Sequence, residues 1–191
     1  MDLNKNWIVE TTLDLNPYKS LLLDDTIKDI ENNTKNKSTS GDSEQYDIFN
    51  KLQEQPLQEL KEYIVNHVKN SLVETRFIMS DENLHLEAAW IVVGKPYGYH
   101  KLHCHRYLQD PKTPNIASVV YLEMEPEEPI RAEDDRDGYF YYAVPENNDI
   151  VYGAIKPIVN KMILFPTWIW HGSYPQKKGR RTSLNLDFSI E

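Results

Sequence analysis

The order of hydrophobic and polar positions divides the chain into two regions of different periodicity. In the first, the apolar residues of Pro56–Glu74 recur every three or four positions, which predicts a helix with one buried stripe. Pro56 suits a first turn, because the N–H that it lacks has no partner inside a helix. Similar spacing predicts a helix over Tyr18–Ile30, and Trp7–Leu13 predicts a short strand. The buried stripe consists of Leu57, Leu60, Ile64, Val68 and Leu72.

Glycine and proline, which interrupt helices and strands, are rare in the first region and frequent in the second. The stretch Glu31–Glu44 contains no apolar residue and predicts a surface loop. The pattern changes near Ser80–Asn83, which we interpret as a joint within one domain. Nine of the 11 prolines and six of the seven glycines lie at or beyond Gly94, so short elements joined by turns are expected there.

Short apolar or alternating runs predict six strands in the second region. They are Leu86–Val93, Tyr97–His105, Ile116–Glu123, Tyr139–Val144, Met162–Phe165 and Thr182–Ile190. Many short strands without alternating helices are typical of an antiparallel barrel or sandwich. We therefore expect a mainly β fold with N-terminal helices covering one sheet.

Composition narrows the class of protein. A length of 191 residues suits a single domain, 1–191. The net charge of −9 argues against a nucleic-acid partner, which needs a basic face. The single cysteine, Cys104, fits a reducing compartment, and no apolar run is long enough to span a membrane. We expect a soluble cytoplasmic protein, and an oligomer is compatible with the sequence.

Two histidines at positions i and i+2 are the first candidates for chemistry. If Tyr97–His105 is a strand, His103 and His105 project from the same face, with backbones about 6–7 Å apart, which suits two imidazoles on one metal ion. In a regular strand His100 points to the opposite face, so we leave it out of the metal site. The alternative is that both are ordinary polar residues on a solvated face.

A third histidine follows a buried strand. The segment Met162–Phe165 ends at Pro166, and the chain then reaches His171 with Trp168 and Trp170 before it. Such a histidine is either a ligand or a packed core residue.

Arg181 opens a strand with strict alternation. Arg181, Ser183 and Asn185 share one face, and Leu184, Leu186, Phe188 and Ile190 share the other. Arginine offers a planar fork for a carboxylate, and serine adds a hydroxyl donor. Taken alone, the polar face is equally explained by exposure to water.

Together these pieces resemble a known family. The order H-x-H, then F-P-x-W-x-x-H, then an arginine ten residues later in an R-x-S strand is similar to the small 2OG-Fe(II) oxygenases of bacteria and their phages, distant relatives of the prolyl hydroxylases. FPTWIWHGSYPQKKGRRTSLNLDF carries most of the resemblance, and AAWIVVGKPYGYHKLHCH and SVVYLE support it. The resemblance implies a double-stranded β-helix (jelly-roll or cupin-like) core over 84–191, a helical N-terminal cover over 1–80, and the host cytoplasm if the protein is phage-encoded.

The resemblance also implies roles for individual residues. His103, His105 and His171 fall on the metal positions, and Fe(II) is the implied metal. Arg181 falls on the arginine that pairs with the distal carboxylate of 2-oxoglutarate (2OG), with Ser183 as its companion and Tyr121 as a second cosubstrate contact. The implied reaction consumes O₂ and 2OG, hydroxylates an amino acid, a peptide side chain or another small molecule, and releases succinate and CO₂. Residues expected to line the substrate entrance are Tyr99, Arg106, Trp168 and Trp170.

One position departs from the wider superfamily. There the second metal ligand is a carboxylate in H-x-D/E, whereas residue 105 is histidine, as in the small family. Asp110 is an alternative oxygen ligand only if the loop after His105 folds back.

Two other functions fit part of the pattern. A cupin-type metal enzyme also uses H-x-H and a late histidine without 2OG, but gives no role to Arg181 and Ser183. A non-catalytic barrel used as a binding or structural module needs no metal at all.

Overall fold

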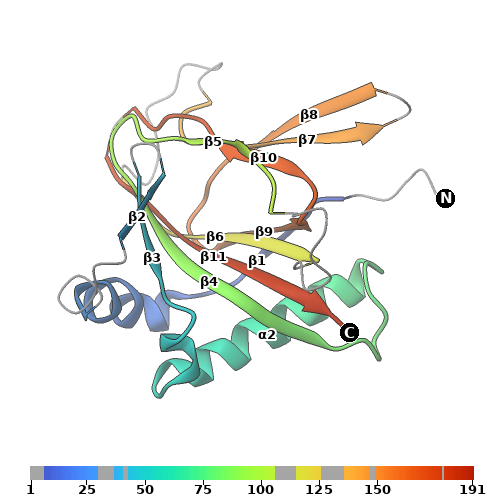
Figure 1. Cartoon of the computed structure of the whole chain (residues 1–191), viewed down its shortest axis with the longest axis horizontal. Helices are drawn as coiled ribbons and strands as arrows, with labels where there is room; N and C mark the ends of the chain where they lie inside the picture. Colours follow the sequence, from blue (N-terminus) through green and yellow to red (C-terminus); the bar gives the residue numbers. More distant parts are fainter. Residues whose placement is uncertain are drawn as a thin grey trace.

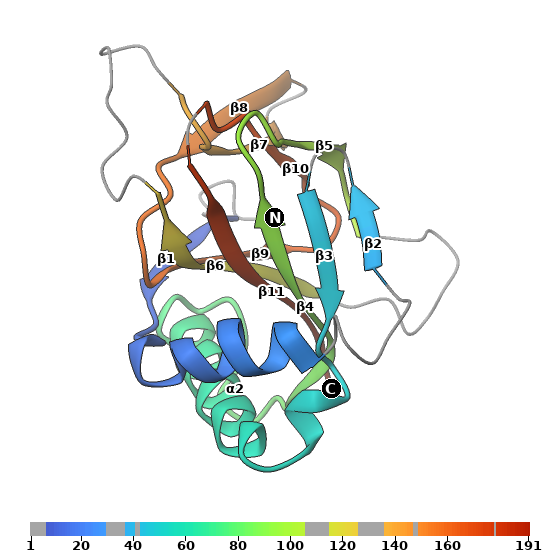
Figure 2. The ribbon, with the colours of Figure 1, turned by 90° about the vertical axis from the view of Figure 1, so that its left-hand side faces the viewer.

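The structure is a computed structural model of the chain and describes residues 7–29, 37–40, 43–105, 115–125, 136–146, 149–177 and 179–191. Two antiparallel sheets face each other, and helices cover the outer face of the larger one (Figures 1 and 2). The larger sheet has the order β1-β9-β6-β11-β4-β3-β2, and the smaller has the order β5-β10-β7-β8. The protein is thus mainly β, as the periodicity predicts.

The larger sheet contains β1 (Val9–Thr12), β2 (Lys37–Ser40), β3 (Ser43–Asp47), β4 (Leu84–Gly94), β6 (Ile116–Met124), β9 (Lys161–Pro166) and β11 (Arg181–Ile190). The smaller sheet contains β5 (His100–His103), β7 (Phe140–Glu146), β8 (Asp149–Ile155) and β10 (Trp170–Ser173). The helical elements are η1 (Asn16–Tyr18), the π-helix η2 (Leu21–Thr26), η3 (Lys51–Gln53) and α2 (Leu57–Glu74). None of the helices in the described residues is long and apolar enough to cross a membrane.

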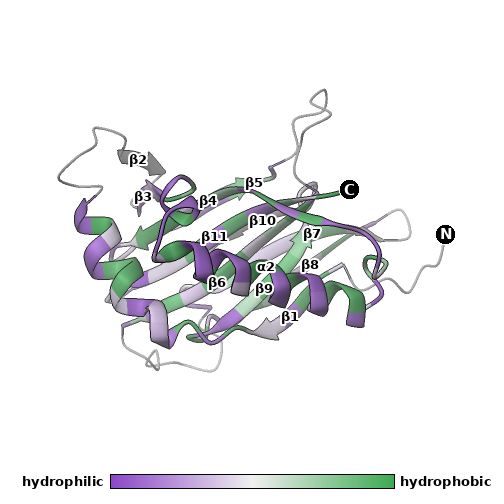
Figure 3. Ribbon diagram, turned by 90° about the horizontal axis from the view of Figure 1, so that it is seen from below, coloured by the Kyte–Doolittle hydropathy of each residue, from purple (hydrophilic) through white to green (hydrophobic). Residues whose placement is uncertain are grey.

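Helix α2 buries one face against the larger sheet. Figure 3 shows its hydrophobic and hydrophilic residues alternating around the helix. The predicted stripe is buried in one cluster with Leu184, Leu186 and Phe188 of β11. Burial of apolar surface on this scale is the main force that holds the helix to the sheet.

A second cluster lies between the two sheets. Strand β9 contributes to both clusters, because Met162 and Leu164 face the helices whereas Ile163 and Phe165 face the smaller sheet. There the ring of Phe165 packs at a tilt against Phe140 of β7, with ring centroids 5.2 Å apart. A strand covered on both faces reads as an unbroken apolar run, which is why the Met162–Phe165 segment shows no alternation.

The first 80 residues differ in part from the sequence prediction. Strands β1, β2 and β3 join the larger sheet, so this region is not only a helical cover. The predicted loop Glu31–Glu44 is wrong where β2 and the start of β3 form a hairpin. Strand β3 pairs with β4 through backbone hydrogen bonds, which do not require apolar side chains. Residues 30–36 lie outside the described part.

Replacing the central contact of α2 tests this packing. Ile64 is 0% exposed, so Ile64→Ala is expected to lower the free energy of unfolding by about 2–5 kcal/mol through lost burial and a cavity. Asn66→Ala, on the exposed face of the same helix, is the control and is expected to change it by less than about 0.5 kcal/mol. Urea unfolding measures both. Equal effects would show that α2 is not anchored through this face.

Candidate active site

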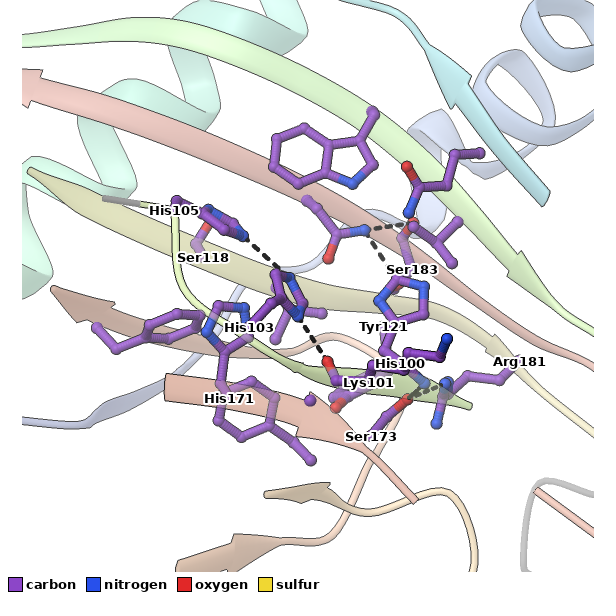
Figure 4. Close-up of a pocket in the computed structure, with 18 residues that line it drawn as sticks. His100, Lys101, His103, His105, Ser118, Tyr121, His171, Ser173, Arg181 and Ser183 are labelled. Carbon is purple, nitrogen blue, oxygen red and sulfur yellow. Dashed lines mark hydrogen bonds between the residues drawn. The ribbon is translucent and has the colours of Figure 1, made fainter. Parts of the chain in front are cut away.

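Three histidine rings converge on one point between the two sheets (Figure 4). His103 ends β5, His105 follows two residues later, and His171 lies on β10 directly opposite His103. The Nε2 atoms of His103 and His105 are 3.3 Å apart. One ligand atom from each of the three rings lies within 4.8 Å of the others.

The other nitrogen of each ring donates to an oxygen that only accepts. His103 Nδ1 donates to the Lys101 carbonyl at 2.8 Å and His171 Nδ1 to the Ile169 carbonyl at 2.9 Å. His105 Nδ1 donates to Asp187 Oδ1, also at 2.9 Å. Since each Nδ1 holds the proton, each Nε2 presents a lone pair to its neighbours.

Burial favours the neutral form of two of the rings, His103 and His171. Removal from water lowers the pKa of His171 well below its usual range, and the other two histidines lower it further. Burial also lowers the pKa of His103. Neutral imidazole is the form that binds metal, so these two rings can bind a metal ion at neutral pH.

The donor set fits a divalent first-row metal. Two nitrogen ligands at right angles, with bonds of about 2.1 Å, lie about 3 Å apart, close to the 3.3 Å between His103 and His105. Imidazole suits Fe, Zn, Cu or Ni, so nitrogen ligands alone do not select among them.

A cavity of about 300 Å³ connects this cluster to Arg181. The arginine is 5% exposed and donates to the Gly138 carbonyl and to Ser173 Oγ, both at 2.7 Å. Burial lowers its pKa from the usual value. These two hydrogen-bond partners are uncharged, and the buried carboxylate of Asp137 acts on the guanidinium without an ion-pair contact. A buried guanidinium that lacks a direct ion pair among the described residues favours an anion in the cavity.

Tyr121 and Ser183 line the same cavity, at the arginine end in Figure 4. Tyr121 is 2% exposed, and burial raises the pKa of its phenol to about 12, so the hydroxyl stays protonated. Ser183 Oγ accepts from Asn185 Nδ2 at 3.2 Å, whereas the hydroxyl that contacts Arg181 belongs to Ser173. The alternation predicted for β11 is therefore present, and its polar face lines the cavity rather than the solvent.

His100 does not point away from the site as a regular strand would require. Between the two paired positions, two residues on β5 (Lys101 and Leu102) oppose one on β10 (Gly172), a bulge that turns the strand. The ring of His100 lines the cavity, with Nε2 3.0 Å from Ser43 Oγ. Burial and then nearby Arg181 lower its pKa to about 4.

Comparison with known proteins places this site in a family. Residues 88–187, just over half of the chain, match the family described as "Putative 2OG-Fe(II) oxygenase". The chain belongs to this family of 2OG-Fe(II) oxygenases. Fe(II) and 2OG are accordingly its cofactor and cosubstrate, and the three histidines and the buried arginine fit both. No curated protein matches the sequence.

Solved oxygenase structures share the fold. A Pseudomonas putida prolyl-4-hydroxylase superposes with a TM-score of 0.66 at 17% identity, over 98% of this chain and 95% of that one. A collagen prolyl hydroxylase of Paramecium bursaria Chlorella virus-1, in complex with 2OG, gives 0.63 at 18% identity over 98% of each chain. A Trichoplax adhaerens prolyl hydroxylase bound to a hypoxia-inducible-factor peptide gives 0.61 at 14% identity, over 98% and 86%. The fold of this oxygenase is thus the double-stranded β-helix that the resemblance implies.

Of the residues expected at the substrate entrance of the oxygenase, the three that the structure describes do not line the cavity. Trp168 packs edge-on against Trp7 at 5.1 Å, and Trp170 is 50% exposed. Alternation along β10 puts Trp170 on the face opposite His171, so its side chain does not line the cavity. Tyr99 also does not line the cavity, and Arg106 and Asp110 lie outside the described residues.

Three residues of the oxygenase site were missed by sequence analysis. Ser173 contacts Arg181, Trp90 of β4 lies 5.6 Å from the His105 ring, and Asp187 hydrogen-bonds that ring. Asp187 had a usable signal, because the alternation Arg181, Ser183, Asn185 continues to residue 187. Ser173 and Trp90 reach the cavity through pairings between distant strands, which the sequence does not reveal.

The buried histidines predict a pH dependence of stability for the metal-free oxygenase. His100 gains a proton near pH 6.5 when unfolded but only near pH 4 when folded, so the unfolded state binds more protons between these values and stability falls as the pH falls. His171 acts in the same direction. From pH 6.5 to 5, His100 alone is expected to cost about 2 kcal/mol.

Urea unfolding with a chelator present, at pH 6.5 and pH 5, measures this loss. His100→Gln is expected to reduce it, whereas His85→Gln, at an exposed histidine, is expected to leave it unchanged. Equal stability of the parent at both pH values would contradict the prediction.

Proposed function

We propose that the protein is a hydroxylase in which His103, His105 and His171 hold Fe(II), and Arg181 binds the distal carboxylate of 2OG. One observation carries the proposal: a single cavity joins three converging imidazole nitrogens to a buried guanidinium whose contacts are neutral. When bound, Fe(II) with 2OG and O₂ supplies the oxidising power, and the coproducts are succinate and CO₂.

The protein's own residues position the reactants. The Arg181 fork orients a carboxylate through paired, charge-assisted hydrogen bonds that burial strengthens. Tyr121, with its phenol protonated, is the second proposed donor to the cosubstrate, and Ser183 offers a hydroxyl beside it. Phe140 and Phe165 line the cavity near His171 and exclude water from it.

We propose an amino acid, a peptide side chain or another small molecule as the substrate. The solved neighbours include prolyl hydroxylases, one of them bound to a peptide fragment, which supports a peptide side chain. The pocket lining includes two neutral amide side chains, Gln45 and Asn185, that suit hydrogen bonding to an amide.

An anaerobic titration with Fe(II) and then 2OG tests both halves of the site. The parent is expected to develop the visible charge-transfer band of a chelated 2-oxoacid. Arg181→Ala is expected to need at least about 30-fold more 2OG, because a buried charge pair is lost. Arg180→Ala is the matched control, since the neighbouring arginine is exposed and pairs with Glu123.

The outcomes separate the candidate functions. A band in the parent that Arg181→Ala leaves unchanged would refute the proposed cosubstrate site. Metal binding without any band would favour a cupin-type enzyme that does not use 2OG. No metal binding would favour a non-catalytic barrel.

Metal binding is also expected to stabilise the fold. Mn(II) at 100 times its dissociation constant contributes about 2.7 kcal/mol, which corresponds to a rise in Tm of about 5–10 °C for a chain of this size. His171→Ala removes one of the three nitrogens and is expected to abolish most of the rise. Differential scanning calorimetry of the metal-free and metal-loaded proteins measures it, and a rise that persists in His171→Ala would place the metal elsewhere.

A further inference from the structure

The second ligand position of this site lacks a charge that most related sites have. Non-haem Fe(II) oxygenases commonly bind iron through two histidines and one carboxylate. Here the cluster consists of three histidines, whose imidazoles are uncharged when they bind a metal. With Fe(II), dianionic 2OG and the Arg181 cation in one cavity whose described lining contains no carboxylate, such a ligand set leaves an excess of positive charge, which is costly away from water.

A carboxylate lies directly behind one of the rings. Asp187 Oδ1 accepts the Nδ1–H of His105 at 2.9 Å, and the two side chains are 9% and 15% exposed. Asp187 lies on β11, across the cavity from β5, and is separated from His105 by 82 positions in the sequence. The contact therefore depends on the tertiary fold. His103 and His171 instead donate to carbonyls two residues earlier on their own segments.

Among the residues that the structure describes, no basic side chain competes with His105 for Asp187. Within the described ranges, its ion-pair partner is His105, and no lysine or arginine lies within ion-pair distance of it. A buried carboxylate with one neutral hydrogen-bond donor is poorly compensated, whereas a metal ion on the far side of the imidazole supplies positive charge through the ring.

We propose that Asp187 is a positioning residue of the metal centre. Its hydrogen bond fixes the His105 ring with Nε2 toward the metal. Its carboxylate also supplies, through that ring, the negative charge that a metal-bound carboxylate supplies in other oxygenases. The inference rests on the proposed metal site. It differs from it in assigning a function to a side chain that touches neither metal nor cosubstrate.

Metal affinity measured without 2OG tests Asp187 apart from turnover. Co(II) is titrated into the metal-free protein and followed by its visible d–d bands. Asp187→Asn, which keeps the size but removes the charge, is expected to weaken Co(II) binding by about 10- to 100-fold, the usual effect of losing an outer partner of a metal-bound histidine. Asp187→Glu, which keeps the charge, is expected to lose less.

A matched control and a coupling test separate positioning from folding. Glu123→Gln makes the same chemical change at a carboxylate that is 19% exposed and pairs with Arg180, remote from the histidines, and is expected to leave Co(II) affinity unchanged. In a His105→Ala background, Asp187→Asn is expected to have no further effect on Co(II) affinity, because the two residues act through one contact. Equal losses in both backgrounds would overturn the proposal.

The parent protein provides a measurement that needs no variant. In ¹⁵N NMR of the metal-free protein, the His105 ring is expected to carry its proton on Nδ1. A ring protonated on Nε2 would overturn the proposal even if Asp187→Asn failed to fold.

The possible failures are distinguishable. If His103→Ala and His171→Ala bind Co(II) like the parent, the metal site itself is wrong. If they lose Co(II) but Asp187→Asn does not, the metal site stands and the role of Asp187 falls.

Discussion

Strand β11 lies between β4 and β6 in the larger sheet, and it has one apolar face and one polar face. One face buries Leu184, Leu186 and Phe188 against the helices. The other face holds Arg181 in the cavity and Asp187 against the His105 ring. Because successive residues of a strand alternate, a slip of one position would move every one of these side chains to the wrong face. The apolar core therefore fixes the register that places the charged groups of the site.

Placing these groups away from water costs electrostatic free energy, which bound ligands would reduce. The cavity contains a buried guanidinium with neutral hydrogen-bond partners and imidazole nitrogens that face one another at 3.3 Å. A metal cation among the nitrogens and the 2OG dianion proposed to bind Arg181 would each remove one of these costs, and their opposite charges would attract each other. The folding energy of the two cores sustains this arrangement, and bound ligands stabilise it further.

The sequence predicted those helices and strands whose residues show a clear spacing of apolar side chains. The stripe of α2, the strands β4, β6, β9 and β11, and the alternation around Arg181 follow from spacing along the chain. Strand β8 was missed because it is an exposed edge strand without a clear buried face, and β10 because Gly172 lies within its four residues. A methyl group at Gly172 would come within 2.6 Å of the His100 carbonyl, a contact between strands that no local pattern records. The bulge that turns His100 into the cavity is a feature of the same pairing.

Because residue 105 is a histidine, the histidine end of the cavity depends on the same strand as the arginine end. A carboxylate ligand would carry its own charge and need no support from another sheet, whereas an imidazole must be oriented through its second nitrogen. The acceptor comes from the strand that also carries Arg181, six residues away on the same face. One strand thus sets the position of the arginine proposed to bind 2OG and the orientation of the proposed metal ligand His105, so any shift of β11 moves both together. In the proposed arrangement, the distance between the metal and the cosubstrate anchor is controlled by a central, largely buried strand of the larger sheet rather than by the loops around the cavity.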